Sequence, residues 1–178
     1  MIALAGMAMI SLISFKPITD APGPKASAML GDWERAKAYT MEYLNAVNDK
    51  TIALKPTPEM RTFGQQMLHL SEVNYQLAAM ASGKESPVAF GQLEKASDKY
   101  ESKEALTKAV MDSYDFVISA LKNMDESKMG ESVKVFNKFD MTREQAFNKV
   151  FEHQTHHRGQ TTVYLRMSGV TPPNEKLF

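Results

Sequence analysis

Four stretches with apolar residues at helical spacing limit this chain to a helical fold. They cover about residues 30–47, 59–82, 102–124 and 142–168, and each repeats apolar side chains every three or four positions. The segments between them contain prolines, which interrupt helices, and glycines, which favour helix ends. Four amphipathic helices of about 20 residues bury their apolar faces best against one another. The pattern therefore predicts an all-α protein, a four-helix bundle.

Local signals predict where the helices start. We expect the second helix to begin near Glu59, because a proline directly before the first turn is well placed there. Ser102 has the form of an N-cap with an acidic residue in the first turn after it. Thr142 opens a Thr-x-x-Gln sequence, which is typical of a capping box and predicts the start of the fourth helix.

The segments between the helices differ in length and character. Residues 51–58 contain two prolines and are expected to form a loop. Residues 84–101 are mixed in composition and predict a long connection with a helical turn. In residues 130–140 apolar and polar positions alternate, which indicates a short extended segment or hairpin before the last helix.

The composition of the chain excludes several classes of partner and of chemistry. The chain has 178 residues, with 21 basic and 21 acidic side chains and a formal net charge of zero. Without a basic excess, nucleic acid is not an expected partner. Cysteine is absent, which excludes disulfides, thiolate nucleophiles and cysteine-based zinc sites. Any metal must therefore be bound by nitrogen and oxygen atoms. Histidine is the only rare residue type among these ligands, so its positions are the most informative.

The N-terminal segment differs from the rest. Residues 1–15 are almost wholly apolar and are followed by a linker rich in proline and glycine up to Pro24. A run of this length is shorter than the roughly 20 residues of a membrane-spanning helix, so no stable membrane span is expected. It resembles the apolar region of a secretory signal. We therefore expect a segment 1–24 that directs export, followed by one domain, residues 25–178. The alternative is an apolar arm packed on a cytoplasmic domain.

Three of the four histidines lie in the sequence Glu152 to Gln160. His153 and His157 are four residues apart, so on a helix they differ by about 40° around the axis and about 6 Å along it. Their imidazoles can converge on one metal ion. His153 and His157 follow the apolar stripe of the predicted helix, whereas His156 falls with charged residues, so we assign His156 to the outside.

The fourth histidine, His69, lies in the middle of the predicted second helix. It sits at the edge of that helix's apolar stripe, a position equally typical of a hydrogen-bonded or surface histidine. Two other metal sites are excluded by spacing: the chain has no His-Glu-x-x-His sequence and no Glu-x-x-His sequence. A mononuclear site of three histidines remains.

These residues resemble a known family, the DinB-like (DinB/YfiT) superfamily. The resemblance covers about residues 27–175 and is most specific in the last helix. It is carried by His153-x-x-x-His157-Arg158-Gly159-Gln160, Leu68-His69, Asp32-Trp33, Lys55-Pro-Thr-Pro58 and Gly169-Val-Thr-Pro-Pro173.

The resemblance implies a bundle of up-down-down-up type that holds one divalent metal ion, usually zinc or nickel. Carried over residue by residue, the ligands would be His69, His153 and His157. Members of the family are often homodimers, and characterised relatives include thiol-dependent S-transferases, isomerases and amide hydrolases. The expected partner is thus a small-molecule substrate or ligand, with a second copy of the chain.

We expect a metal-dependent hydrolase or thiol-dependent transferase. The alternatives are a non-catalytic metal or small-ligand binding bundle, and a dimeric structural protein. Gln160 and Arg158 are the candidate catalytic residues. Arg158 either pairs with an acid across the bundle or meets an anionic group of the substrate. Asn74 and Tyr75, about a turn beyond His69, are candidates for the mouth of the pocket. No carboxylate is placed on the inward stripe, which favours activation of water or a thiol by the metal alone.

Overall fold

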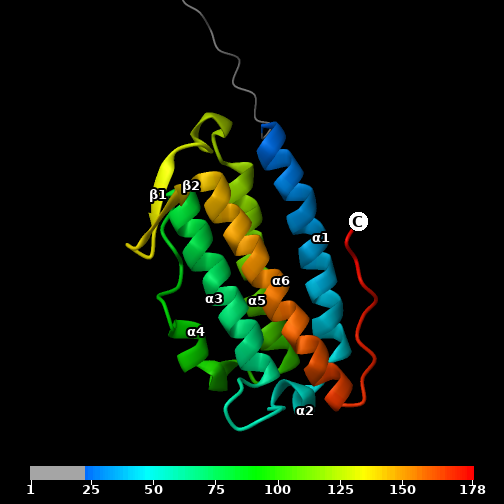
Figure 1. Cartoon of the computed structure of the whole chain (residues 1–178). Helices are drawn as coiled ribbons and strands as arrows, with labels where there is room; N and C mark the ends of the chain where they lie inside the picture. The colour runs from blue at the N-terminus through cyan, green and yellow to red at the C-terminus, as the bar shows by residue number, and fades with distance from the viewer. Residues whose placement is uncertain (1–22) are drawn as a thin grey trace, which may run out of the picture.

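A computed structural model describes residues 23–178 of the chain. Its frame is four long helices, α1 (Pro24–Ala46), α3 (Phe63–Ser82), α5 (Lys103–Lys122) and α6 (Arg143–Met167). Figure 1 shows α1 and α6 running in one direction and α3 and α5 in the other. This is the expected up-down-down-up order. Residues 1–22 of the predicted export segment lie outside the described residues.

Each long helix packs mainly on two of the other three. α3 contacts α6 and α5, and α1 contacts α5 and α6. Because α3 and α5 run in the same direction, the connection between them must return along the length of the bundle (Figure 1). This connection contains a short helix α4 (Gln92–Lys95) and a 3-10 turn η1 (Ser97–Tyr100), which confirms the predicted long connection with a helical turn.

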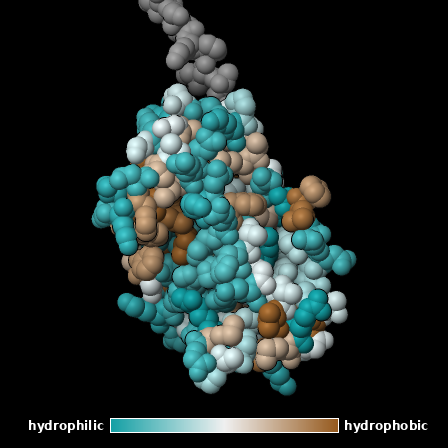
Figure 2. Space-filling model, viewed as in Figure 1, coloured by the Kyte–Doolittle hydropathy of each residue, from teal (hydrophilic) through white to brown (hydrophobic). Residues whose placement is uncertain are grey.

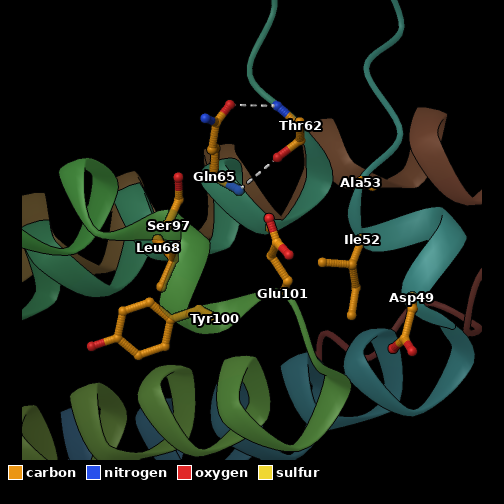
Figure 3. Close-up of a pocket in the computed structure, with 10 residues that line it drawn as sticks. Asp49, Ile52, Ala53, Thr62, Gln65, Leu68, Ser97, Tyr100 and Glu101 are labelled. Atoms are coloured by element: carbon orange, nitrogen blue, oxygen red, sulfur yellow. Dashed lines mark hydrogen bonds between the residues drawn. The ribbon is translucent and has the colours of Figure 1, made fainter.

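The start of α3 differs from the sequence prediction. Thr62 is its N-cap: the backbone N–H of Gln65 donates to Thr62 Oγ1 at 3.1 Å, and the N–H of Thr62 donates to Gln65 Oε1 at 3.0 Å (Figure 3). This reciprocal capping box satisfies two backbone donors, which Pro58 and Glu59 cannot do. The helix therefore begins at Phe63 and not near Glu59. The preceding segment is also less irregular than expected, because α2 (Asp49–Ile52) forms one helical turn there.

The start of α1 also differs, since the helix begins at Pro24 and not near residue 30, and a proline is well placed in the first turn. The predicted starts of α5 and α6 and the end of α3 are confirmed. Ser102 caps α5, and Thr142 forms a capping box with Gln145 at the start of α6. Gly83 ends α3 in the left-handed conformation, with φ of 77°, which a glycine adopts without strain. After a 3-10 turn η2 (Glu126–Lys128), strands β1 (Ser132–Val135) and β2 (Phe139–Thr142) pair antiparallel as a hairpin.

The core lies along the bundle axis and is rich in large aromatic side chains. Trp33 and Tyr114 are almost fully buried, and their rings meet edge to face with centroids 5.6 Å apart. Phe63 and Tyr164 form a similar pair between α3 and α6. On the face seen in Figure 2, hydrophobic residues appear only as small separate patches among hydrophilic ones. None of the described helices combines the length and the apolar character that crossing a membrane requires.

Candidate metal centre

The histidine cluster forms where α3 and α6 pack side by side. α3 supplies His69, and α6 supplies His153 and His157 from successive turns. The ring centroids lie 5.1 Å apart for His69 and His153, 4.6 Å for His69 and His157, and 4.3 Å for His153 and His157. One ligand nitrogen from each ring lies within 4.8 Å of the others. The structure therefore brings together the three histidines that the sequence selected.

His156 stays outside this cluster. It is exposed on α6, although its ring contacts that of His157 edge to face at 4.9 Å. The helical face argument made from the sequence is confirmed on this point.

The unpaired nitrogens of the cluster fit a metal ion. His153 Nδ1 and His157 Nδ1 are buried and have no hydrogen-bond partner among residues 23–178. Buried polar atoms in proteins nearly always have a partner, because an unpaired one loses its hydration without compensation. Three imidazoles that converge, with unpaired nitrogens among them, match the donor set of a mononuclear site for zinc or a similar divalent ion.

Both histidines of α6 are held in the neutral form that metal binding requires. Burial, and to a smaller extent the neighbouring histidines, lower the pKa of His153 from 6.5 to about 3. Burial and the same neighbours lower the pKa of His157 to about 4. Near neutral pH the ring nitrogens therefore keep their lone pairs for a metal ion.

His69 is oriented by a carboxylate that sequence reasoning missed. Its Nδ1–H donates to Glu94 Oε1 at 2.6 Å. Arg61 holds the same carboxylate through Nε at 2.7 Å and Nη2 at 3.3 Å. Burial alone would raise the pKa of Glu94, but the hydrogen bonds from Arg61 and His69 outweigh it and lower the pKa. An ionised carboxylate on one ring nitrogen fixes the tautomer and directs Nε2 toward a metal.

Glu94 is itself positioned by a second buried acid. Glu72 is almost fully buried on α3, and its carboxylate accepts the backbone N–H of Gly91 and, at 3.0 Å, that of Leu93. These two bonds attach the start of α4 to α3. Leu93 is buried beneath this turn, so Glu94, the next residue, projects toward His69.

Of the two candidate catalytic residues, Gln160 lies at the cluster. Its side chain hydrogen-bonds His157 and thereby raises the pKa of that ring, against the stronger effects that lower it. Its Oε1 also accepts a hydrogen bond from Gln66 Nε2 on α3. The amide is thus fixed between the two helices that carry the histidines.

Arg158 is placed elsewhere. It is buried on the side of α6 that faces α1, where Nη1 donates to Gln154 Oε1 at 3.0 Å and its guanidinium lies 4.5 Å from the Tyr39 ring centroid. It pairs with no carboxylate among residues 23–178. The prediction of an acidic partner across the bundle is wrong, because α1 presents hydroxyl, carbonyl and aromatic groups at this position.

Asn74 and Tyr75 do not line the cluster. Asn74 is buried against α5, where its Nδ2 donates to Ser113 Oγ at 3.2 Å. The Tyr75 ring packs on that of Phe116, also on α5. Both residues point to the α5 side of α3, whereas His69 points to the α6 side, so their role is in packing.

A separate cavity of about 320 Å³ lies near the start of α3 and contains none of the histidines. Figure 3 shows it between the α3 N-terminus, α2 and η1, with Glu101, Ile52 and Tyr100 around it. Its acidic residues have no basic or histidine partner in the lining, and nothing about them indicates a metal site.

The signals for Glu94, Arg61 and Glu72 in the sequence are weak. Arg61 lies in the connection before α3, 8 residues before His69, and Glu94 lies in the short helix α4, 25 residues after it, so no periodicity of α3 relates them to His69. Glu72 offered one hint, since it is an acid three residues after His69 within a run of buried positions.

Comparisons with known proteins agree with the fold. A DinB-like protein of Bacillus cereus has a similar structure, with a TM-score of 0.68 at 20% sequence identity over 84% of this chain and 97% of that one. A DinB-like protein of Bacillus subtilis gives a TM-score of 0.63 at 14% identity, over 85% and 96% of the two chains. No curated protein matches the sequence. The sequence matches the DinB family over residues 23–177, and the chain therefore belongs to the DinB family.

Proposed function

We propose that this protein is a metal-dependent enzyme whose three-histidine centre acts on a small molecule, as a hydrolase or a thiol-dependent S-transferase. The observation that carries the proposal is the cluster itself: three convergent imidazoles, two with unpaired buried nitrogens and the third oriented by an ionised carboxylate. A purely structural helix contact needs none of these features.

Each residue of the centre has a distinct part. His69, His153 and His157 would bind the ion, zinc or nickel, and leave a position open for water or substrate. A bound ion of this kind acts as a Lewis acid and brings the pKa of water toward about 7, or favours the thiolate of a thiol substrate. Glu94 keeps His69 in the correct tautomer. Gln160, fixed by Gln66, offers its amide to a polar group of the substrate.

The carboxylate nearest the cluster is not available as a general base. Glu94 is committed to Arg61 on one side and His69 on the other, and these contacts lower its pKa. Its conjugate acid is too strong for efficient proton abstraction near neutral pH. Activation by the metal alone is therefore the simplest mechanism for this centre.

Two measurements test the proposal. Elemental analysis of untagged protein should find about one zinc or nickel per chain, consistent with one three-ligand site, and His157→Ala should lose it. Purified wild type should then turn over at least one ester, amide or electrophile, the last with a thiol present, and His153→Ala should abolish that turnover. Protein without stoichiometric metal contradicts the metal centre. Metal-loaded protein that turns over nothing in the panel contradicts the enzyme and leaves a binding bundle.

Two expectations from the sequence extend the proposal. The family resemblance supports a homodimer, which light scattering coupled to size-exclusion chromatography would detect as a doubled mass. The apolar residues 1–15 support export, which fractionation of expressing cells would test. A cytoplasmic location of full-length protein would contradict export.

A further inference from the structure

A second polar cavity lies on the other side of α6 from the histidines. It has a volume of about 510 Å³ and is bounded by α1, α6 and the C-terminal segment 171–177. Its lining on α6 includes Thr155, Arg158, Thr162 and Arg166, all on a different face from His153 and His157. The cavity is thus separate from the candidate metal centre.

The unusual feature of this cavity is Arg158. The residue is 6% exposed, and its guanidinium hydrogen-bonds Gln154, Thr40, the carbonyl of Ala36 and the hydroxyl of Tyr114. These partners are all uncharged, and no carboxylate of residues 23–178 pairs with Arg158, although its side chain lines the cavity. A buried cation without a counter-charge is costly, by several kcal/mol in typical cases, and arginine cannot relieve the cost by losing its proton.

The surroundings orient the guanidinium without neutralising it. Tyr39 stacks against it at 4.5 Å, and Gln154 accepts from Nη1. Gln154 is in turn held by the hydroxyl of Tyr114, at 2.9 Å. These contacts fix the plane of the guanidinium but supply no counter-charge, an arrangement suited to pairing with a planar carboxylate in the cavity.

The rest of the lining indicates the kind of anion. Arg166 adds a second positive charge and Glu175 a negative one, so the net charge of the lining suits a monoanion better than a phosphate dianion. Tyr39, Tyr43 and Pro173 supply flat apolar surface beside the arginine. The hydroxyl of Tyr43 is already bonded to Thr162 Oγ1 at 2.9 Å, which keeps the wall rigid.

The C-terminal segment forms the outer wall and is attached to α1. Arg35 Nη1 donates to the carbonyl of Lys176 at 2.9 Å, and Lys176 Nζ pairs with Glu42. Figure 1 shows this segment running back beside α1 after α6 ends. The wall is therefore part of the folded protein.

We propose that this cavity is a binding site for a small organic monocarboxylate, whose carboxylate pairs with Arg158 and whose body packs on Tyr39 and Tyr43. The site is independent of the metal centre. A small aromatic acid such as benzoate has the required charge and shape.

Isothermal titration calorimetry of the full-length protein with benzoate tests the proposal. Wild type should bind benzoate saturably and should bind neither benzamide, which lacks the charge, nor inorganic phosphate with comparable affinity. Arg158→Met should weaken binding at least about tenfold, since a charge-assisted pair contributes about 1.5–3 kcal/mol. Lys149→Gln is the matched control: it removes one positive charge from the exposed surface of the same helix and should change nothing.

Further variants separate this site from the metal centre. His153→Ala should bind benzoate like wild type, whether or not the protein carries metal. If His153→Ala loses benzoate binding and Arg158→Met keeps it, the ligand binds at the histidines and the proposal is overturned. Equal binding by wild type and Arg158→Met, a preference for phosphate, or no saturable binding would also overturn it.

Arg158 is buried, so its replacement could disturb folding, which circular dichroism would show. In that case Arg166→Gln decides, because Arg166 is exposed and lines the same cavity. It should weaken benzoate binding a few-fold, in the range typical of an exposed ion pair. Unchanged affinity in this variant overturns the assignment.

Discussion

The two sides of α6 hold polar side chains in opposite ways. On the side facing α3, His153 and His157 are kept neutral by burial and by the neighbouring histidines, and the carboxylate of Glu94 binds the third ring, His69. On the side facing α1, Arg158 keeps its charge and has no acidic partner among the described residues. Neutral, unpaired nitrogen suits a cation, whereas an unpaired cation suits an anion. Residues adjacent in sequence, His157 and Arg158, are thus suited to opposite ligand chemistries.

The largest effect is expected from removing a histidine. His157→Ala leaves two imidazoles and should lower metal affinity by more than about 100-fold, beyond the usual effect of an outer partner. Zinc titration against a competing chelator measures this. His156→Ala is the matched control, since that residue is exposed on the same helix, and its affinity should equal that of wild type. Equal losses in both variants would contradict the assignment of ligands.

Glu94→Gln should give an intermediate effect. The amide keeps the shape of the carboxylate but weakens its hold on the Nδ1–H of His69, so metal affinity should fall by about 10–100-fold. The same titration measures it, with Glu101→Gln as the control from the same connection, because Glu101 lies in the separate cavity shown in Figure 3. An unchanged affinity in Glu94→Gln would show that the carboxylate only attaches the connection to α3.

The pH dependence of the stability of the metal-free protein also distinguishes the two sides of α6. The pKa values of His153 and His157 are lower in the folded state, about 3 and about 4, than the ordinary value of 6.5. Between these limits the unfolded chain binds more protons, so the free energy of unfolding should fall as the pH decreases from about 6.5 toward 4. Urea denaturation at several pH values measures this.

A double variant, His153→Gln with His157→Gln, should flatten that pH dependence. Arg158→Met should leave it as in wild type, because arginine does not titrate in this range. A wild-type stability that rises on acidification would contradict the burial of neutral histidines.

The smallest effect is expected for the stability of Arg158→Met. Removing a buried charge that has no counter-charge is often neutral or stabilising, so the free energy of unfolding should change by less than about 1 kcal/mol, or increase. Chemical denaturation without added ligand measures it, beside Lys149→Gln. A loss of several kcal/mol would show that Arg158 mainly supports the fold, with its hydrogen bond to Gln154 as the reason.

The parts of the structure that could be predicted share one property: each depends on a pattern of residues close together in the sequence. Apolar spacing located the helices, and Thr142 with Gln145 marked the start of α6. The spacing of His153 and His157 selected the inward pair by the same logic. α3 began four residues later than predicted because the proline signal at Pro58 was weaker than the Thr62 capping box.

What could not be predicted depends on contacts across the fold. Glu94 lies in the long connection between α3 and α5, and it hydrogen-bonds His69. The attachment of α4 to Glu72 determines that Glu94 is the residue of this connection that reaches the imidazole. The partners of Arg158 depend on which groups α1 presents, and apolar periodicity carries no information about hydroxyls and carbonyls.

The attachment of α4 to Glu72 also bears on how this protein could be re-engineered. Glu72 accepts hydrogen bonds from backbone N–H groups, so it fixes the path of the chain at Gly91 and Leu93 whatever side chains the neighbouring residues carry. Residues 84–85 and 101 are therefore suitable places for library diversification or for inserted loops, whereas Ser86 bonds Gln76 and Ser102 caps α5. Such changes should leave the orientation of His69 unchanged.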